Sequence, residues 1–199
     1  MGGVEERTTG RLAAFTDGVF AIAITLLVLT IRIPEPQEDL GQVLVRQWPA
    51  FVAYTISFLA IGVMWVSHHQ MFTVIVRTTT TFLFLNILFL LPIAFFPYPT
   101  ALVATYLLEP SGRTLAVLVY GATSVAIAVM FNVLWGYASR RGLLIPRARP
   151  NGLRTRGFSL GPVVYLAGTL AAIVNPFVAL AIFAAVTVYW MLPGRLPGR

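Results

Sequence analysis

The chain has 199 residues, of which 58% are hydrophobic and 11% charged, and it contains no cysteine, which excludes disulfides and thiol chemistry. With a mean hydropathy of +0.83, this composition is that of an integral membrane protein and leaves little of the chain for a soluble domain. The formal net charge is +7, but the arginines lie between apolar segments and at the chain ends, as membrane topology requires, so we exclude nucleic acid as a partner.

The first predicted membrane span covers residues 12–31 and opens with a carboxylate. The stretch RLAAFTD, from Arg11 to Asp17, places this acid inside a segment otherwise suited to lipid. Pro34 and Pro36 disfavour helix beyond the span. Because an ionisable side chain facing lipid is costly, we expect Asp17 to be buried against another helix and paired.

A stripe of side chains follows the same helix. Successive side chains are rotated by about 100°, so Gly18, Ile22, Thr25 and Leu29 share one face, and Asp17 lies roughly a right angle away. Two interpretations are open. The stripe is either ordinary helix packing, in which small residues allow close approach, or the lining of a pore on a symmetry axis. In the second case the apolar residues form constrictions and the Thr25 hydroxyls meet a partly dehydrated ion.

Five further spans follow an acidic loop that contains Glu35, Glu38 and Asp39. We place them at residues 48–69, 81–108, 113–139, 158–174 and 177–193, the third span of the chain being kinked near its prolines. The whole chain, 1–199, is predicted to be a single transmembrane domain. Six spans with cytoplasmic termini leave only Arg32, Arg46 and Arg113 outside, which agrees with the positive-inside rule better than five spans do.

The second span ends in side chains that can pair with Asp17. Its partners are expected to be Arg11 and His68 or His69, and Trp65 can add an indole N–H. We interpret this group as a structural clamp that positions the first helix. A proton relay between Asp17 and His68 in a secondary transporter is the alternative, and a non-conducting membrane scaffold is a second one. Adjacent histidines point about 100° apart on a helix, so we expect no metal site.

Other polar residues have local interpretations. Asn86, Asn132 and Asn175 are expected to form interhelical hydrogen bonds worth on the order of 1 kcal/mol each. The arginine-rich loop from Arg140 to Arg156 either enforces topology or binds anionic lipid headgroups. The sequence contains no GxSxG, HExxH or P-loop motif, so we expect neither an enzyme nor a cofactor.

The first helix also carries a motif. Arg11, Phe15, Thr16 and Asp17, followed by GVFAIAITLLVLTI, resemble the RxxxFSD signature that opens the first helix of the transmembrane protein 175 family. This family comprises the lysosomal potassium channel and its bacterial relatives. The stretch WVSHH at the end of the second span is similar to the family's second helix. The length of the chain resembles the bacterial form, which is a tetramer of single repeats.

The resemblance implies an all-α integral membrane protein with six membrane helices per chain. Four copies of the first helix are expected to line a potassium-selective pore without a TVGYG filter. Ile22 matches the family's apolar constriction and Thr25 its hydroxyl layer, and Leu26 and Leu29 are candidates for further apolar layers. The residues that match the signature or complete its polar network are Arg11, Phe15, Thr16, Asp17, Trp65, His68 and His69.

One feature of the chain conflicts with a cation pore. Arg32 follows the first span, and a ring of four positive charges at the outer mouth opposes cation entry. Glu35, Glu38 and Asp39 are close enough in sequence to offset it. We expect the plasma membrane as the location, because the lysosomal address belongs to the animal relatives.

Overall fold

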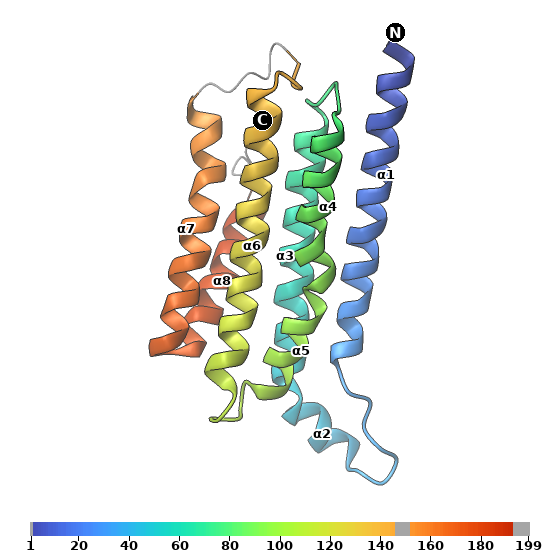
Figure 1. The fold of residues 1–199 in the computed structure, drawn as a ribbon. Coiled ribbons are helices and arrows are strands. Elements are labelled where there is room, and N and C mark those ends of the chain that lie inside the picture. The colour runs from blue at the N-terminus through green and yellow to red at the C-terminus, as the bar shows by residue number, and fades with distance from the viewer. Residues whose placement is uncertain (1, 146–151, 193–199) are drawn as a thin grey trace.

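The computed structural model describes residues 2–145 and 152–192, with side chains from 9 to 145 and from 160 to 192. The regular elements in these ranges are helices that stand side by side in a bundle (Figure 1). The predicted all-α class is confirmed. In chain order the helices are α1 (Gly2–Leu26), the 3-10 helix η1 (Leu27–Thr30), α2 (Leu40–Arg46), α3 (Trp48–Phe72), α4 (Thr80–Phe95), α5 (Pro97–Tyr106), α6 (Arg113–Arg140), α7 (Gly152–Val174) and α8 (Pro176–Met191).

Four segments are long and apolar enough to cross a membrane. They are Thr9–Thr30, Trp48–Phe72, Thr80–Tyr106 and Arg113–Arg140. The two remaining apolar helices, Leu160–Val174 and Pro176–Met191, are shorter than the roughly 20 residues that a perpendicular span needs. The structure by itself therefore supports four membrane spans, and the expected six go beyond it.

Prolines and one asparagine explain where the apolar segments break. Pro97 has no backbone N–H and its ring clashes with the preceding turn, so α4 ends at Phe95 and α5 begins at Pro97. Asn175 separates α7 from α8, and its side-chain oxygen accepts a 2.9 Å hydrogen bond from the backbone N–H of Phe177. Asn175 therefore caps α8, and its side chain satisfies the first N–H groups of that helix.

The loop after the first span contains a helix that the sequence analysis did not predict. The acidic stretch was expected to be irregular, but Leu40–Arg46 forms α2. The Asp39 carboxylate accepts a 3.0 Å hydrogen bond from the backbone N–H of Gln42 and thereby caps this helix. The C-terminal end of the first predicted span is also different, since residues 27–30 tighten into η1.

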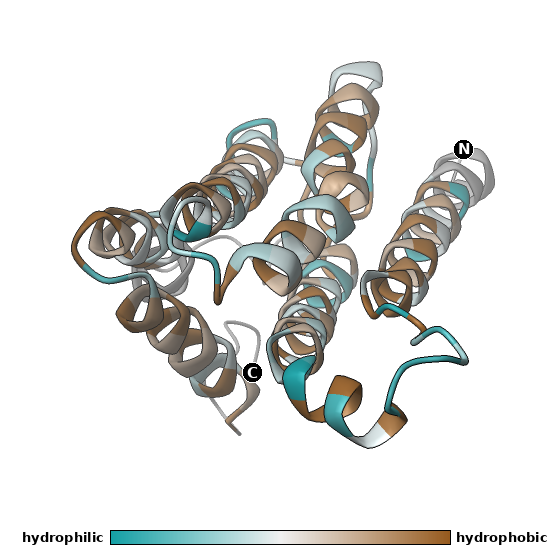
Figure 2. Ribbon diagram, turned by 90° about the horizontal axis from the view of Figure 1, so that it is seen from below, coloured by the Kyte–Doolittle hydropathy of each residue, from teal (hydrophilic) through white to brown (hydrophobic). Residues whose placement is uncertain are grey.

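α1 lies at one edge of the bundle. It packs against α3 and α4, whereas α7 lies on the far side of the bundle and α8 packs against α7, α3 and α6 (Figures 1 and 2). The buried side chains of α1 and η1 recur every three or four residues, at Leu12, Thr16, Phe20 and Ala23 of α1 and at Leu27 of η1. This spacing gives one buried face toward the bundle and leaves the opposite face of α1 uncovered within the chain.

Candidate functional site

The uncovered face of α1 carries the stripe that the sequence singled out. The side chains of Ile22, Leu26 and Leu29 are 60%, 41% and 75% exposed. Thr25 is exposed among them, and a Cβ added at Gly18 would meet nothing within 4 Å. Within the described chain these residues form a continuous surface, and they contribute nothing to the core of the bundle.

The hydroxyl of Thr25 is oriented by its own helix. Thr25 Oγ1 donates to the backbone carbonyls of Ala21 at 3.0 Å and Ile22 at 2.9 Å. Because the hydroxyl proton is directed at these carbonyls, the oxygen lone pairs are left to face away from the helix. An exposed oxygen held in this way accepts hydrogen bonds or contacts a cation.

The exposure and the partner of Asp17 differ from those predicted from the sequence. We expected a buried carboxylate paired with Arg11 or a histidine, but Asp17 is exposed within the chain. Its Oδ1 accepts a 2.8 Å hydrogen bond from Trp65 Nε1 of α3. Among the described residues Asp17 forms no ion pair with Arg11, His68 or His69. The reason is its place on α1, between the buried face and the stripe, where it reaches only the rim of α3.

His68 lies inside the bundle, three residues along α3 from Trp65 and turned toward the core. It is 2% exposed, and its ring stacks on Phe72 at 4.3 Å and on Phe89 at 5.4 Å between centroids. Its Nε2 lies 3.0 Å from Asn86 Oδ1 of α4. The environment of His68 is therefore aromatic, with one hydrogen-bond partner, and the ring belongs to the core.

Asn86 connects His68 to the signature on α1. Its Nδ2 donates a 2.8 Å hydrogen bond to Oγ1 of Thr16, and both Asn86 and Thr16 are 0% exposed. Since the amide nitrogen faces Thr16, the amide oxygen faces His68, and the proton on His68 Nε2 lies between them. Thr16, Asn86 and His68 thus form a buried chain of hydrogen bonds across α1, α4 and α3. The sequence marked Asn86 only as an interhelical hydrogen-bond residue.

The remaining signature residues lie on the surface of the chain. His69 is exposed and stacks on Trp65 at 5.5 Å. Phe15 is 55% exposed and Arg11 is also exposed. The predicted network is therefore divided into two parts, a buried one that joins the helices and an exposed one around Asp17 and Trp65.

At the opposite end of α1 the charge of Arg32 is paired. Its Nη2 donates to both carboxylate oxygens of Glu38 at 2.7 Å, and the backbone N–H of Glu35 donates to Glu38 Oε2 at 2.7 Å. The hydrogen bond and charge of Arg32 lower the pKa of Glu38, and Glu38 raises the pKa of Arg32. The carboxylate thereby offsets the positive charge near the end of the exposed stripe.

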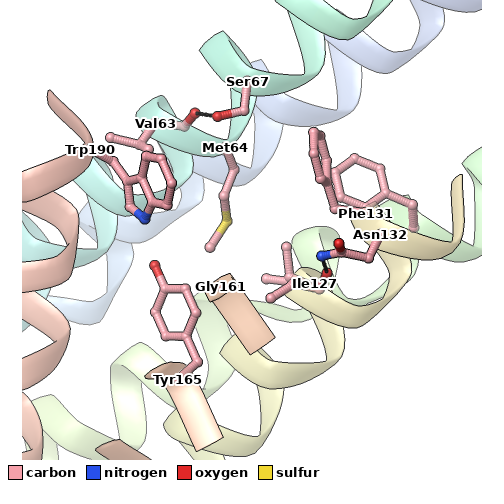
Figure 3. A pocket seen from close by; sticks show the side chains of 11 residues that line it. Val63, Met64, Ser67, Ile127, Phe131, Asn132, Gly161, Tyr165 and Trp190 are labelled. Atoms are coloured by element: carbon pink, nitrogen blue, oxygen red, sulfur yellow. Dashed lines mark hydrogen bonds between the residues drawn. The ribbon is translucent and has the colours of Figure 1, made fainter. Parts of the chain in front are cut away.

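The bundle also contains a small, partly open cavity. It has a volume of about 80 Å³ among α3, α6, α7 and α8, and the side chains of Met64, Phe131, Tyr165 and Trp190 line it. The Tyr165 hydroxyl and the Trp190 indole nitrogen point into it (Figure 3). This volume suffices for a few water molecules. With mostly apolar walls, the cavity offers no path for an ion through one chain.

Comparison with known proteins gives consistent matches. A family model described as "Endosomal/lysosomal potassium channel TMEM175" matches residues 11–97. A potassium channel of Streptomyces collinus is 40% identical over 190 residues, covering 92% of this chain and 91% of the relative. A potassium channel of Chamaesiphon minutus is 38% identical over 195 residues, covering 94% and 96%.

A solved structure and an animal protein are also similar. The crystal structure of a lysosomal potassium-selective channel TMEM175 homologue from Chamaesiphon minutus aligns with a TM-score of 0.83 at 37% identity, covering 93% of this chain and 97% of that one. The endosomal/lysosomal proton channel TMEM175 of Gallus gallus is 31% identical over an alignment of 154 residues, which covers 71% of this chain and 31% of the relative.

Proposed function

Since this chain belongs to the TMEM175 family, we propose that it is a potassium-selective channel that conducts passively across the plasma membrane. The two bacterial relatives that align with 92% and 94% of this chain are both named potassium channels. In the proposed assembly four chains form a homotetramer, and α1 of each lines the central pore.

The exposed polar groups of α1 carry this proposal. Asp17 and Thr25 lie on the surface of a helix long and apolar enough to span a membrane. A carboxylate facing hydrocarbon costs about 3 kcal/mol, so this surface of α1 requires protein or water against it. A closed ring of identical chains supplies both, since the flank with Asp17 meets a neighbour and the stripe faces the axis.

α7 shows what a lipid-facing surface looks like in the same chain. Its exposed large side chains are apolar without exception among residues 160–174, namely Leu160, Val163, Leu166, Leu170, Ile173 and Val174. Such a face needs no partner in a bilayer. The exposed face of α1 differs from it by its carboxylate, its hydroxyl and its open glycine, and this difference favours an axial position for α1.

The order of the stripe residues gives the pore its proposed layers. Ile22, Leu26 and Leu29 form apolar constrictions, which exclude water when narrow and thereby control ion passage. Thr25 contributes a ring of four hydroxyl oxygens whose lone pairs replace part of the hydration shell of a potassium ion. Conduction through this proposed pore needs no cofactor, because the pore binds the permeant ion itself.

The proton-coupled transporter is less well supported. It requires exchange of a proton between Asp17 and His68, but Asp17 accepts from Trp65 and His68 Nε2 is engaged by Asn86 in an aromatic environment. A direct relay between the two is therefore absent from the described residues. We accordingly favour passive conduction.

The proposed topology has six spans and cytoplasmic termini. α7 and α8 form a hairpin, so α8 runs back toward the end of the bundle at which α1 begins (Figure 1). An even number of crossings agrees with the excess of arginine on the side of the termini. Local thinning of the bilayer and snorkelling of flanking side chains let the shorter α7 and α8 cross.

Two measurements test the proposal, namely the mass of the purified assembly and its ion flux in liposomes. Native mass spectrometry of the purified protein should give a tetramer, and reconstituted liposomes should pass potassium down its gradient at equal pH on both sides. A monomer, or no ion flux, supports the scaffold. Flux that requires a proton gradient supports the transporter. Proton flux should be recorded in parallel, because the animal relative is named a proton channel.

A further inference from the structure

A second feature of the chain is a groove between α4, α6 and α7, at the end of the bundle where α4 begins and α6 ends. Its volume is about 880 Å³, within the range of roughly 300–1,000 Å³ typical of ligand sites. The walls combine Thr81 and Leu85 of α4 with Pro162 of α7 and the last three turns of α6. The groove takes no part in the proposed pore.

The charge of the groove is concentrated at one end. Arg140 and Arg141 line it and are both exposed. The Arg141 guanidinium lies 5.8 Å from the centre of the Tyr137 ring, which holds this cation beside the groove. The Tyr137 hydroxyl is itself 3.1 Å from Thr79 Oγ1, so the aromatic ring is anchored to α4.

The chemistry changes along α6 away from these arginines. Gly136, then Val133 and Val129, line the groove on successive turns. From Arg140 to Val129 an α-helix rises about 16 Å, which is about half of a hydrocarbon core of about 30 Å. The groove is therefore cationic at the membrane surface and mainly apolar through the depth of one leaflet, where Asn132 is the polar side chain of its lining.

We propose that this groove binds one anionic phospholipid, with its phosphate at Arg140 and Arg141 and an acyl chain along Gly136, Val133 and Val129. The combination of a basic end and a leaflet-deep apolar wall matches the two parts of such a lipid, and juxtamembrane arginines attract anionic headgroups. This narrows the expected lipid contact of the loop from Arg140 to Arg156 to its first two arginines. The side chains of its other arginines lie outside the described residues.

The groove is accessible to lipid in the proposed assembly. α4 packs against both α1 and α6, and the groove lies among α4, α6 and α7 without a lining residue from α1. If α1 faces the symmetry axis, the groove faces outward. Lipid binding itself does not depend on conduction, so failure of either proposal is recognised separately.

The wild-type protein provides the first test. Delipidated protein in detergent is titrated with dioleoylphosphatidylglycerol, with dioleoylphosphatidylcholine of the same chains, or with glycerol phosphate as the free headgroup, and bound lipid is counted by native mass spectrometry. We expect phosphatidylglycerol to bind at least about tenfold more tightly than the other two. Equal binding of phosphatidylcholine, or equal competition by glycerol phosphate, overturns the proposal in favour of a non-selective apolar groove or a simple anion site.

Two variants then locate the lipid. A Cβ added at Gly136 would meet nothing within 4 Å, so Gly136→Leu fits the helix and fills the groove while keeping both arginines. Ala122→Leu, on an exposed position of the same helix, is the matched control. We expect about tenfold weaker phosphatidylglycerol binding in Gly136→Leu and wild-type binding in the control.

The second variant removes the charge without filling the groove. Arg140→Gln with Arg141→Gln should also weaken binding about tenfold, whereas Arg140→Lys with Arg141→Lys should retain most of it. Helix content and monodispersity are checked for every variant. Wild-type affinity in both Gly136→Leu and the glutamine pair places the lipid elsewhere and overturns the proposal.

Discussion

Trp65 Nε1 donates a 2.8 Å hydrogen bond to Oδ1 of Asp17, and this bond joins the exposed carboxylate of α1 to the rim of α3. Together with the buried bond from Asn86 to Thr16, it holds α1 at two points that lie on different sides of the helix. Two such points fix the rotation of α1 about its own axis. The direction in which Ile22 and Thr25 face is therefore set by contacts within the chain.

Loss of the carboxylate should weaken assembly. We expect Asp17→Ala to reduce the tetramer fraction and to cost about 2 kcal/mol, the usual contribution of a hydrogen bond to a charged group. Trp65→Phe keeps an aromatic ring beside His69 but removes the N–H, so it should have a similar effect. Size-exclusion chromatography and thermal unfolding of both single variants and the double variant provide the measurement.

The double variant distinguishes a specific bond from independent damage. If Asp17 and Trp65 act through their hydrogen bond, the double variant is little worse than either single one. Fully additive losses, or an assembled and normally conducting Asp17→Ala protein, would contradict the role given to Asp17.

Removal of the buried acceptor at Thr16 should destabilise the fold. Thr16→Val keeps the shape but leaves the Asn86 N–H unpaired, at a cost of about 1–3 kcal/mol. Thr55→Val is the matched control, because Thr55 is exposed and, among the described residues, its hydroxyl donates only to the backbone carbonyl of Phe51. Thermal unfolding in one detergent should show a lower Tm for Thr16→Val only. Equal Tm values for the two variants mean that the buried chain of hydrogen bonds contributes little.

These residues also show which features of the protein can be predicted from its sequence and which cannot. Hydropathy predicts where the apolar segments lie, because each follows from local composition alone. The spacing RxxxFTD identifies the helix that carries the signature. The partner of Asp17 cannot be predicted in this way, because Trp65, His68 and His69 lie within about one turn of each other on α3. The relative rotation of α1 and α3 decides which of these three side chains meets Asp17. Sequence periodicity does not predict this rotation.

The helix α2 was missed, and the partners of Asn86 were not predicted, although its expected interhelical hydrogen bonding is confirmed. The capping residue Asp39 was visible in the sequence, but α2 is only 7 residues long and was hidden by the acidic character of its loop. Asn86 was visible as an amide in an apolar segment. Its two partners are 70 and 18 residues away along the chain, so their meeting depends on the packing of three helices.

The ion pair at the end of α1 should tune cation entry. Because the pKa of Glu38 is lowered in the folded protein, its negative charge is present above the ordinary glutamate pKa of about 4.3 and is lost as the pH falls through the lowered value. Potassium flux should therefore be insensitive to this group between pH 7 and 5 and should fall only in stronger external acid.

The effect of the Glu38 charge on potassium flux can be measured at neutral pH with a variant. Glu38→Gln leaves Arg32 without its carboxylate and should lower potassium flux about twofold or more at low salt, with a smaller effect at high salt. The double variant Arg32→Gln with Glu38→Gln should recover flux. If Glu38→Gln conducts normally at low salt, the charge of Arg32 lies away from the ion path.

The apolar constriction should respond to a polar side chain. Ile22→Asn places an amide on the stripe, so we expect a wetted constriction and several-fold higher flux in an intact tetramer. Val28→Asn is the comparison variant, since Val28 is 52% exposed in η1, which continues α1, but lies off the stripe on the flank that carries Asp17. Flux from reconstituted liposomes should rise for Ile22→Asn alone. A similar rise in Val28→Asn points to general loosening of α1.

The most direct test of whether the exposed face of α1 lines the pore is the potassium-to-sodium flux ratio of Thr25 variants, measured in liposomes with equal pH on both sides. Thr25→Ala removes the hydroxyl ring, and Thr25→Ser keeps it. We expect Thr25→Ala to conduct but to lose most of its preference for potassium, whereas Thr25→Ser should remain selective. A ratio that is unchanged in Thr25→Ala, with the tetramer intact, contradicts the claim that this face of α1 lines the pore.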